Sequence, residues 1–181
     1  MPTNLPEHPC ETIKDLLREH WNPDNSSGLD PYTDPRTDGG LEIGRGWFDT
    51  HSYPLSIAVQ MPGNTGEDVL DGGDAGYSGW DPSGAGGTQT RLGDPRIDIF
   101  AEGDREYGTD ALEAEEIVFA LRTECEDIID AAAGQGSRDV PMPDAFESLS
   151  SVWRGNPNDT DPTPTVFRSV VEVTYSWERW P

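Results

Sequence analysis

The sequence predicts an α+β protein: an antiparallel sheet with one long helix packed on it, a short N-terminal helix and a C-terminal β-hairpin. Two observations carry this prediction. An apolar stripe at helical spacing runs through residues 110–133, and apolar residues alternate with polar ones through residues 165–180. We expect one domain over residues 1–181, with a Gly/Asp-rich loop excursion at residues 61–93.

Residues 11–21 (ETIKDLLREHW) predict the short N-terminal helix, because Ile13, Leu16, Leu17 and Trp21 fall on one face of it. Prolines stand just before and just after this segment, where helices commonly begin and end.

Three strands follow in the prediction. Residues 53–60 (YPLSIAVQ) alternate apolar and small or polar residues, which is typical of a strand. Residues 41–50 (LEIGRGWFDT) show a weaker form of this pattern, and residues 96–101 (RIDIFA) resume it after the long loop.

The segment over residues 110–133 predicts the long helix. Asp110 and Glu113 form a D-x-x-E capping box at its start, and Gly134 is a natural stop. Val118 and Phe119 widen its apolar stripe, so we expect the helix to be covered on two sides.

The last part of the chain predicts a β-hairpin. Residues 148–155 (SLSSVWRG) form its first strand, a loop rich in Pro, Asn and Asp reverses the chain, and residues 165–180 form the second strand. One face of the second strand carries mostly apolar side chains, from Phe167 through Val171 to Tyr175.

The composition indicates adaptation to a salt-rich cytoplasm. The net charge is −23 over 181 residues, and the acidic residues are spread through the chain rather than gathered in one tail. Such self-repulsion destabilises a compact protein unless salt screens it, and at molar salt the Debye length is about 3 Å. A negative field of this kind repels nucleic acid, so no specific nucleic-acid binding is expected.

The sequence offers no catalytic signature, and we expect no enzymatic activity and no cofactor. No histidine lies in a G-x-S-x-G or similar motif, and no phosphate-binding Gly loop is followed by a helix start. Asp98, Glu102 and Asp104 cluster after a strand, where an acid/base or metal site is conceivable, but clustering by chance explains this in a chain with 35 acidic residues.

The two cysteines, Cys10 and Cys125, match no metal-binding spacing, and Cys125 is expected to be a small core residue. The first ten residues have no apolar core of a signal peptide, and no stretch has the roughly 18 apolar residues that span a bilayer. We therefore expect neither secretion nor membrane contact.

Aromatic residues at two places are candidate contacts to another subunit or partner. The Gly/Asp-rich loop carries Tyr77 and Trp80 at its tip, and the far end of the last strand carries Tyr175, Trp177 and Trp180. Aromatic residues are enriched at interfaces. Two other interpretations of the loop remain open: a solvated loop, and a Ca²⁺ site over residues 68–81, although its order differs from an EF-hand. The far end of the last strand could equally belong to the sheet alone.

The element order resembles a known group of viral proteins. A short helix at Ile13–Trp21, strands at Tyr53–Gln60 and Arg96–Ala101, a long helix at Asp110–Ala133 and an Arg-x-Val-x-Glu-Val-x-Tyr strand within Arg168–Trp177 are similar to the tail-completion and tail-terminator proteins of tailed viruses. The loop at Met61–Gly93 departs from the compact pattern of that family.

This resemblance implies a structural virion protein that forms a ring, as a hexamer, at the head–tail junction and joins the tail tube to the portal and connector. The acidic composition adds that the virus infects haloarchaea, so the protein would be found in the virion and, during assembly, in the host cytoplasm. DNA would pass through the lumen of the ring. Two alternatives stay open: a cytoplasmic halophilic binding or adaptor module without enzymatic activity, and a hydrolase or metal-dependent enzyme that uses the acidic cluster near Asp98.

Overall fold

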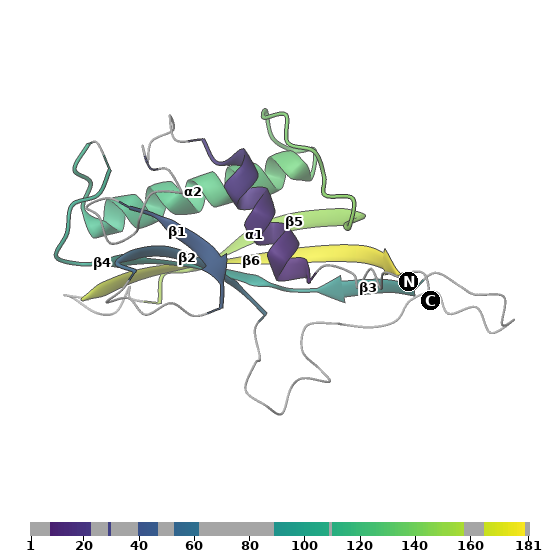
Figure 1. Ribbon diagram of the computed structural model, residues 1–181, viewed down its shortest axis with the longest axis horizontal. Coiled ribbons are helices and arrows are strands. Elements are labelled where there is room, and N and C mark those ends of the chain that lie inside the picture. The colour runs from purple at the N-terminus through teal and green to yellow at the C-terminus, as the bar shows by residue number, and fades with distance from the viewer. Residues whose placement is uncertain are drawn as a thin grey trace, which may run out of the picture.

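The computed structural model describes residues 8–22, 29, 40–46, 53–61, 89–108, 110–157 and 165–179. Two helices and six strands occur in this part of the chain (Figure 1): α1 (Pro9–His20), β1 (Glu42–Arg45), β2 (Leu55–Gln60), β3 (Gln89–Gly93), β4 (Arg96–Glu102), α2 (Ala114–Ala132), β5 (Ser148–Gly155) and β6 (Val166–Arg179). The predicted α+β class is confirmed, with the 19-residue helix α2 packed on a sheet.

The sheet is mixed rather than wholly antiparallel. β1 pairs with β2 in parallel, whereas the pairs β2–β4, β4–β6, β3–β6 and β5–β6 are antiparallel. β3 lies within residues 61–93, which were predicted as a loop excursion, so Gln89–Gly93 form a strand instead.

The long strand β6 is the centre of the sheet. β4 pairs with its first half and β3 with its last residues, while β5 pairs with residues 170–176. Because β5 overlaps both β4 and β3 along β6, it must lie on the opposite side of β6 from them. The order across the sheet is therefore β1, β2, β4, β6 and β5, and β3 lies on the same side of β6 as β4.

Both helices lie on one face of the sheet (Figure 1). α1 packs over β1 and β2, and α2 packs over β4, β5 and β6. The strand residues that face the helices form the hydrophobic core with α1 and α2, and all are at most 5% exposed: Ile43, Leu55, Ile57, Val59, Ile97, Ile99, Ala101, Leu149, Val171, Val173 and Tyr175.

The start of α1 differs from the prediction by two residues. The side chain of His8 accepts a hydrogen bond from the backbone N–H of Cys10 at 3.2 Å, and Pro9 occupies the first turn. A capping side chain and a proline without an N–H group suit the unpaired donors of a helix start. The helix therefore begins at Pro9 and not at residue 11.

The start of α2 also differs, because the capping box lies three residues later than predicted. Glu113 is the N-cap, and the Glu116 carboxylate accepts from the backbone N–H of Glu113 at 3.1 Å. Before it, Tyr107 and Leu112 form an isolated antiparallel bridge, which holds the chain out of a helix. The predicted end is confirmed, since Gly134 follows the helix with φ +77°.

Neither helix in the described part of the chain is long and apolar enough to cross a bilayer.

Candidate subunit interface

The predicted contact residues divide into those the structure describes and those outside it. Tyr77, Trp80 and Trp180 lie outside the described residues. The backbone of Trp177 pairs with Arg91 of β3, so this position belongs to the sheet. The far end of β6 was predicted to extend past the sheet because residues 89–93 were predicted as loop. Their pairing with β6 makes that end part of the sheet.

Tyr175 is a core residue and is not available to a partner in this structure. Its side chain is 1% exposed, and its ring centroid lies 5.0 Å from that of Phe146. The alternation along β6 points Tyr175 toward the helices, together with Val171 and Val173. This corrects its assignment as a contact residue.

A different group of apolar side chains is exposed. Among the described residues, the large hydrophobic side chains with high exposure are Phe119 at 59%, Val152 at 48% and Trp153 at 45%. Phe119 projects from α2 and Trp153 from β5 on the helix side of the sheet, whereas Val152 lies on the opposite face of β5, because it pairs with Glu172. We call Phe119, Arg122 and Trp153 the β5 patch. Val118 and Phe119 were both expected to widen the covered face of α2; Val118 is 4% exposed and does so, whereas Phe119 does not.

Arg122 joins the two rings of the β5 patch. Its guanidinium carbon lies 4.6 Å from the centroid of the Phe119 ring and 4.6 Å from that of the Trp153 ring. The Trp153 indole N–H donates to the Ser169 hydroxyl at 3.2 Å. These contacts hold the rings in place while their outer surfaces stay in water. A cation over an aromatic face contributes about 0.5–1 kcal/mol at an exposed site.

The β5 patch adjoins an open edge of the sheet. In the described part of the chain β5 pairs with β6 alone, so the opposite edge of Ser148–Gly155 presents unpaired backbone groups. β5 has no acidic residue, and its Arg154 pairs with Glu172 at 2.5 Å. The carboxylates beside this edge are engaged by their neighbours, since Asp130 accepts from the Ser151 hydroxyl and Glu126 pairs with Arg122.

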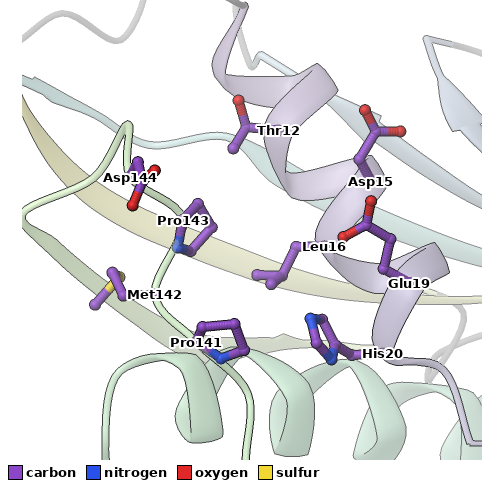
Figure 2. A pocket seen from close by; sticks show the side chains of 9 residues that line it. All are labelled: Thr12, Asp15, Leu16, Glu19, His20, Pro141, Met142, Pro143 and Asp144. Carbon is purple, nitrogen blue, oxygen red and sulfur yellow. The ribbon is translucent and has the colours of Figure 1, made fainter.

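A groove lies between α1 and the segment Pro141–Asp144 (Figure 2). Its volume is about 360 Å³. Figure 2 shows Leu16 of α1 facing Pro141 and Pro143 across it, with Asp15 and Glu19 on the same helix. The remaining lining residues are Thr12, His20, Met142 and Asp144. In the described part of the chain no three His, Cys, Asp or Glu residues come together in a way that could hold a metal ion.

Asp98 and Glu102, which the sequence offered as a conceivable acid/base or metal site but which chance clustering also explained, have separate partners in the structure. Asp98 is fully buried on the face away from the helices, where it accepts from Arg96 Nε at 2.8 Å and from Arg168 Nε at 2.9 Å. Gln60 also donates to it. Glu102 instead pairs with Arg105 at 2.6 Å. A carboxylate held by two guanidinium groups has a structural role, and its oxygens are already engaged.

The two thiols are buried and unreactive. Burial raises the pKa of Cys10 from 9.0 to about 11, although the nearby Arg45 opposes this, and burial raises the pKa of Cys125 well above 9.0. Because the thiolate is the nucleophile, these cysteines are poor candidates for covalent catalysis. The prediction that Cys125 is a core residue is confirmed by its 0% exposure.

A second buried carboxylate fixes the helices to each other. Glu124 of α2 is 2% exposed and makes a bidentate pair with Arg138, with both N–O distances 2.6 Å. It also accepts from the backbone N–H of Asn22, just after α1. Glu124 thus links α2, the chain after α1 and the turn that follows α2.

No protein-family model matches the chain, and no curated protein is significantly similar to it in sequence.

Sequence reasoning missed the β5 patch, although part of its signal was available. Phe119 lies off the narrow stripe that Ile117, Leu121 and Cys125 define, which was reason to expect it in water. The exposure of Trp153 could not be predicted, because it depends on β5 being the edge of the sheet.

Proposed function

We propose that this chain is a structural protein that assembles with copies of itself into a ring, at the head–tail junction of a tailed virus of haloarchaea. In this role it joins the tail tube to the portal and connector. The ring is proposed as a hexamer, and the proposal assigns the chain no catalytic activity and no cofactor.

The observation that carries the proposal is the β5 patch beside an open strand edge. Trp153 and Phe119 are held in place by Arg122 with about half of their surfaces in water. Aromatic residues and Arg are enriched in protein interfaces, and an open edge strand is a template for pairing with another chain. A soluble protein has little reason to keep both features exposed unless a partner covers them.

The charge supports the same proposal. A lumen through which DNA passes without sticking requires a negative wall, and the net charge of −23 supplies acidic groups for it. Under the proposal, some of these acids line the lumen. Neutralising them is expected to slow the ejection of the genome, and an unchanged rate of ejection would contradict this part of the proposal.

Copy number in purified virus particles tests the assignment. Quantitative mass spectrometry in high salt is expected to find about six or twelve copies per particle, as a closed ring of cyclic symmetry requires. Tens to hundreds of copies would indicate a tube or shell protein instead. The absence of the chain from particles would contradict the virion role.

The groove between α1 and Pro141–Asp144 favours a second candidate, a halophilic binding or adaptor module. Its apolar floor, with Leu16 and Met142, and its acidic rim suit a basic side chain of a partner peptide. This candidate predicts a monomer that binds a basic peptide, and loss of binding when Leu16 is replaced by Asp. Failure of basic peptides to bind the wild-type protein would exclude it.

A further inference from the structure

The two outer strands of the sheet run in opposite directions. β1 is parallel to β2, β2 is antiparallel to β4, β4 is antiparallel to β6, and β6 is antiparallel to β5. Following these pairings across the sheet, β1 points the same way as β6 and opposite to β5. In the described part of the chain β1 pairs only with β2, just as β5 pairs only with β6.

This geometry suits a head-to-tail arrangement. In such an arrangement one surface of a copy meets a different surface of the next copy, and this pair of surfaces recurs at every contact. When copies stand side by side in one orientation, β5 of one copy meets β1 of the next. The two strands are then antiparallel, and the backbone groups that both leave open can pair. A contact between two β5 edges would instead need a two-fold axis, which gives a closed dimer and no ring.

One register of β5 against β1 of the next copy also brings compatible side chains together. Trp153 and Ile43 both face the helices in their own sheets, since Trp153 pairs with Val171 and Ile43 with Ile57. If Trp153 stands opposite Ile43, Val152 stands opposite Gly44. β5 has a β-bulge after Trp153, since Trp153 pairs with Val171 and Gly155 with Val170, so Arg154 has no regular cross-strand partner. The Arg154 side chain lies on the face of Glu172, which is also the face of Glu42, so the two side chains come beside each other there.

The charges and volumes in this register fit. A positive side chain meets a negative one, and the exposed Val152 meets a glycine. Cross-strand pairs of opposite charge contribute about 0.2–1 kcal/mol each. On the helix face, α1 packs over β1, so the rings of Phe119 and Trp153 would come against α1 of the next copy.

We infer that β5 of one copy pairs antiparallel with β1 of the next copy, with Trp153 beside Ile43 and Arg154 beside Glu42. This inference rests on the proposed self-assembly and adds the surfaces and the register by which it occurs. The occupant of the β5 edge is thus a second copy of this chain. β5 itself has no acidic residue, and the carboxylates in contact with it, Asp130 and Glu172, are engaged by Ser151 and Arg154, which limits the repulsion when another acidic copy approaches.

Cross-linking of mixed single-cysteine variants tests the inference. Val152→Cys and Gly44→Cys are mixed in molar KCl and treated with a short bis-maleimide. Cβ atoms directly opposite each other in an antiparallel pair lie about 4.5–5.5 Å apart, which such a reagent spans. We expect cross-linked dimers in the mixture and none in either variant alone. The buried Cys10 and Cys125 should give no product in the wild-type protein.

The matched control uses Arg105→Cys in place of Val152→Cys, because Arg105 is exposed and lies after β4, outside both β1 and β5. It should give no product with Gly44→Cys. Cross-links in Val152→Cys alone would overturn the inference in favour of two-fold pairing. A ring that forms without any β5–β1 product also overturns it, while leaving self-assembly intact. A chain that stays monomeric contradicts the proposed assembly itself.

A charge exchange gives an independent readout. Arg154→Glu is expected to raise the protein concentration needed for assembly about fivefold. Adding Glu42→Arg in the same chain should restore assembly, because each contact then again joins a positive and a negative side chain, with the two charges exchanged between the strands. If the loss came only from the internal pair of Arg154 with Glu172, Glu42→Arg would not rescue it. Failure of the rescue in a folded double variant would contradict the register.

Discussion

Arg122 of α2 and Trp153 of β5 stack with 4.6 Å between the guanidinium carbon and the ring centroid, and the indole remains 45% exposed. The same guanidinium covers the Phe119 ring, so one cation fixes two aromatic side chains. Two ordered rings that keep half their surface in water are pre-organised for contact with a partner, because little side-chain entropy remains to be lost on binding.

Replacing Trp153 by Ser is expected to abolish or strongly weaken assembly while changing the free energy of unfolding by about 1 kcal/mol or less. The side chain is half exposed, so it contributes little to the core of a single chain. Light scattering in molar KCl measures the mass, and denaturant unfolding measures the stability. Val140→Ala, in the core of the same chain, is the converse control and should lower stability without changing the mass of the particle. Normal assembly of Trp153→Ser would count against the β5 patch as an interface.

Arg138→Ala is expected to destabilise the fold by about 3 kcal/mol, because it leaves the buried Glu124 carboxylate without its charged partner. Arg105→Ala is the matched control. Arg105 also pairs with a glutamate, but its side chain is 40% exposed, and such surface pairs contribute about 0–1 kcal/mol. The two variants are compared by denaturant unfolding at one salt concentration. Equal effects of the two substitutions would show that Glu124 is not held as the structure places it.

Asp98→Asn is expected to lower the free energy of unfolding by about 3 kcal/mol, because Arg96 and Arg168 then share a buried site without a negative charge. Asp104→Asn, at an exposed position, should change it by about 0.5 kcal/mol or less. Metal content measured by plasma mass spectrometry should be the same for the wild type and both variants. Stoichiometric metal that Asp98→Asn removes would instead support the metal-enzyme alternative.

Stability is expected to fall as the pH rises above about 9. Burial raises the pKa of Cys10 to about 11 and that of Tyr107 to about 12, so the folded protein keeps protons that the unfolded chain releases. When the folded state binds more protons, the free energy of unfolding decreases with increasing pH. The contribution of Cys10 is complete below its ordinary pKa of 9.0 and is lost between that value and about pH 11.

Cys10→Ala tests this assignment, since it removes one of the titrating groups. The variant should be less stable at pH 7, because it leaves a small cavity, yet its stability should fall less steeply between pH 9 and pH 11 than that of the wild type. Unfolding curves measured across this range give both slopes. Identical slopes would mean that Cys10 does not titrate differently in the two states.

The sequence predicted the helices and the central strands well because their signals are local. The stripe on α2 and the alternation on β6 follow directly from the helical and strand periods. The cap of α2 was misplaced because Asp110 and Glu113 match the favoured D-x-x-E capping box, whereas the box that forms has Glu113 at the N-cap and Glu116 at N3. The bridge between Tyr107 and Leu112 excludes the earlier start.

The candidate site was much harder to predict, because it depends on contacts between distant segments. β3 has no apolar alternation of its own, and its pairing with β6 is what makes it a strand. That pairing also changes the far end of β6 from a free projection into part of the sheet. The exposure of Trp153 depends on β5 being the outer strand, and the burial of Asp98 depends on an arginine 70 positions away in the sequence.

The mass of the purified chain in molar KCl, measured by sedimentation and light scattering at several protein concentrations, tests the central claim most directly. The account predicts a discrete particle of about six times the 19.8 kDa of one chain, which dissociates when Trp153 is replaced by Ser. A chain that remains a monomer at every concentration, with the rings of Phe119 and Trp153 still exposed, would contradict it.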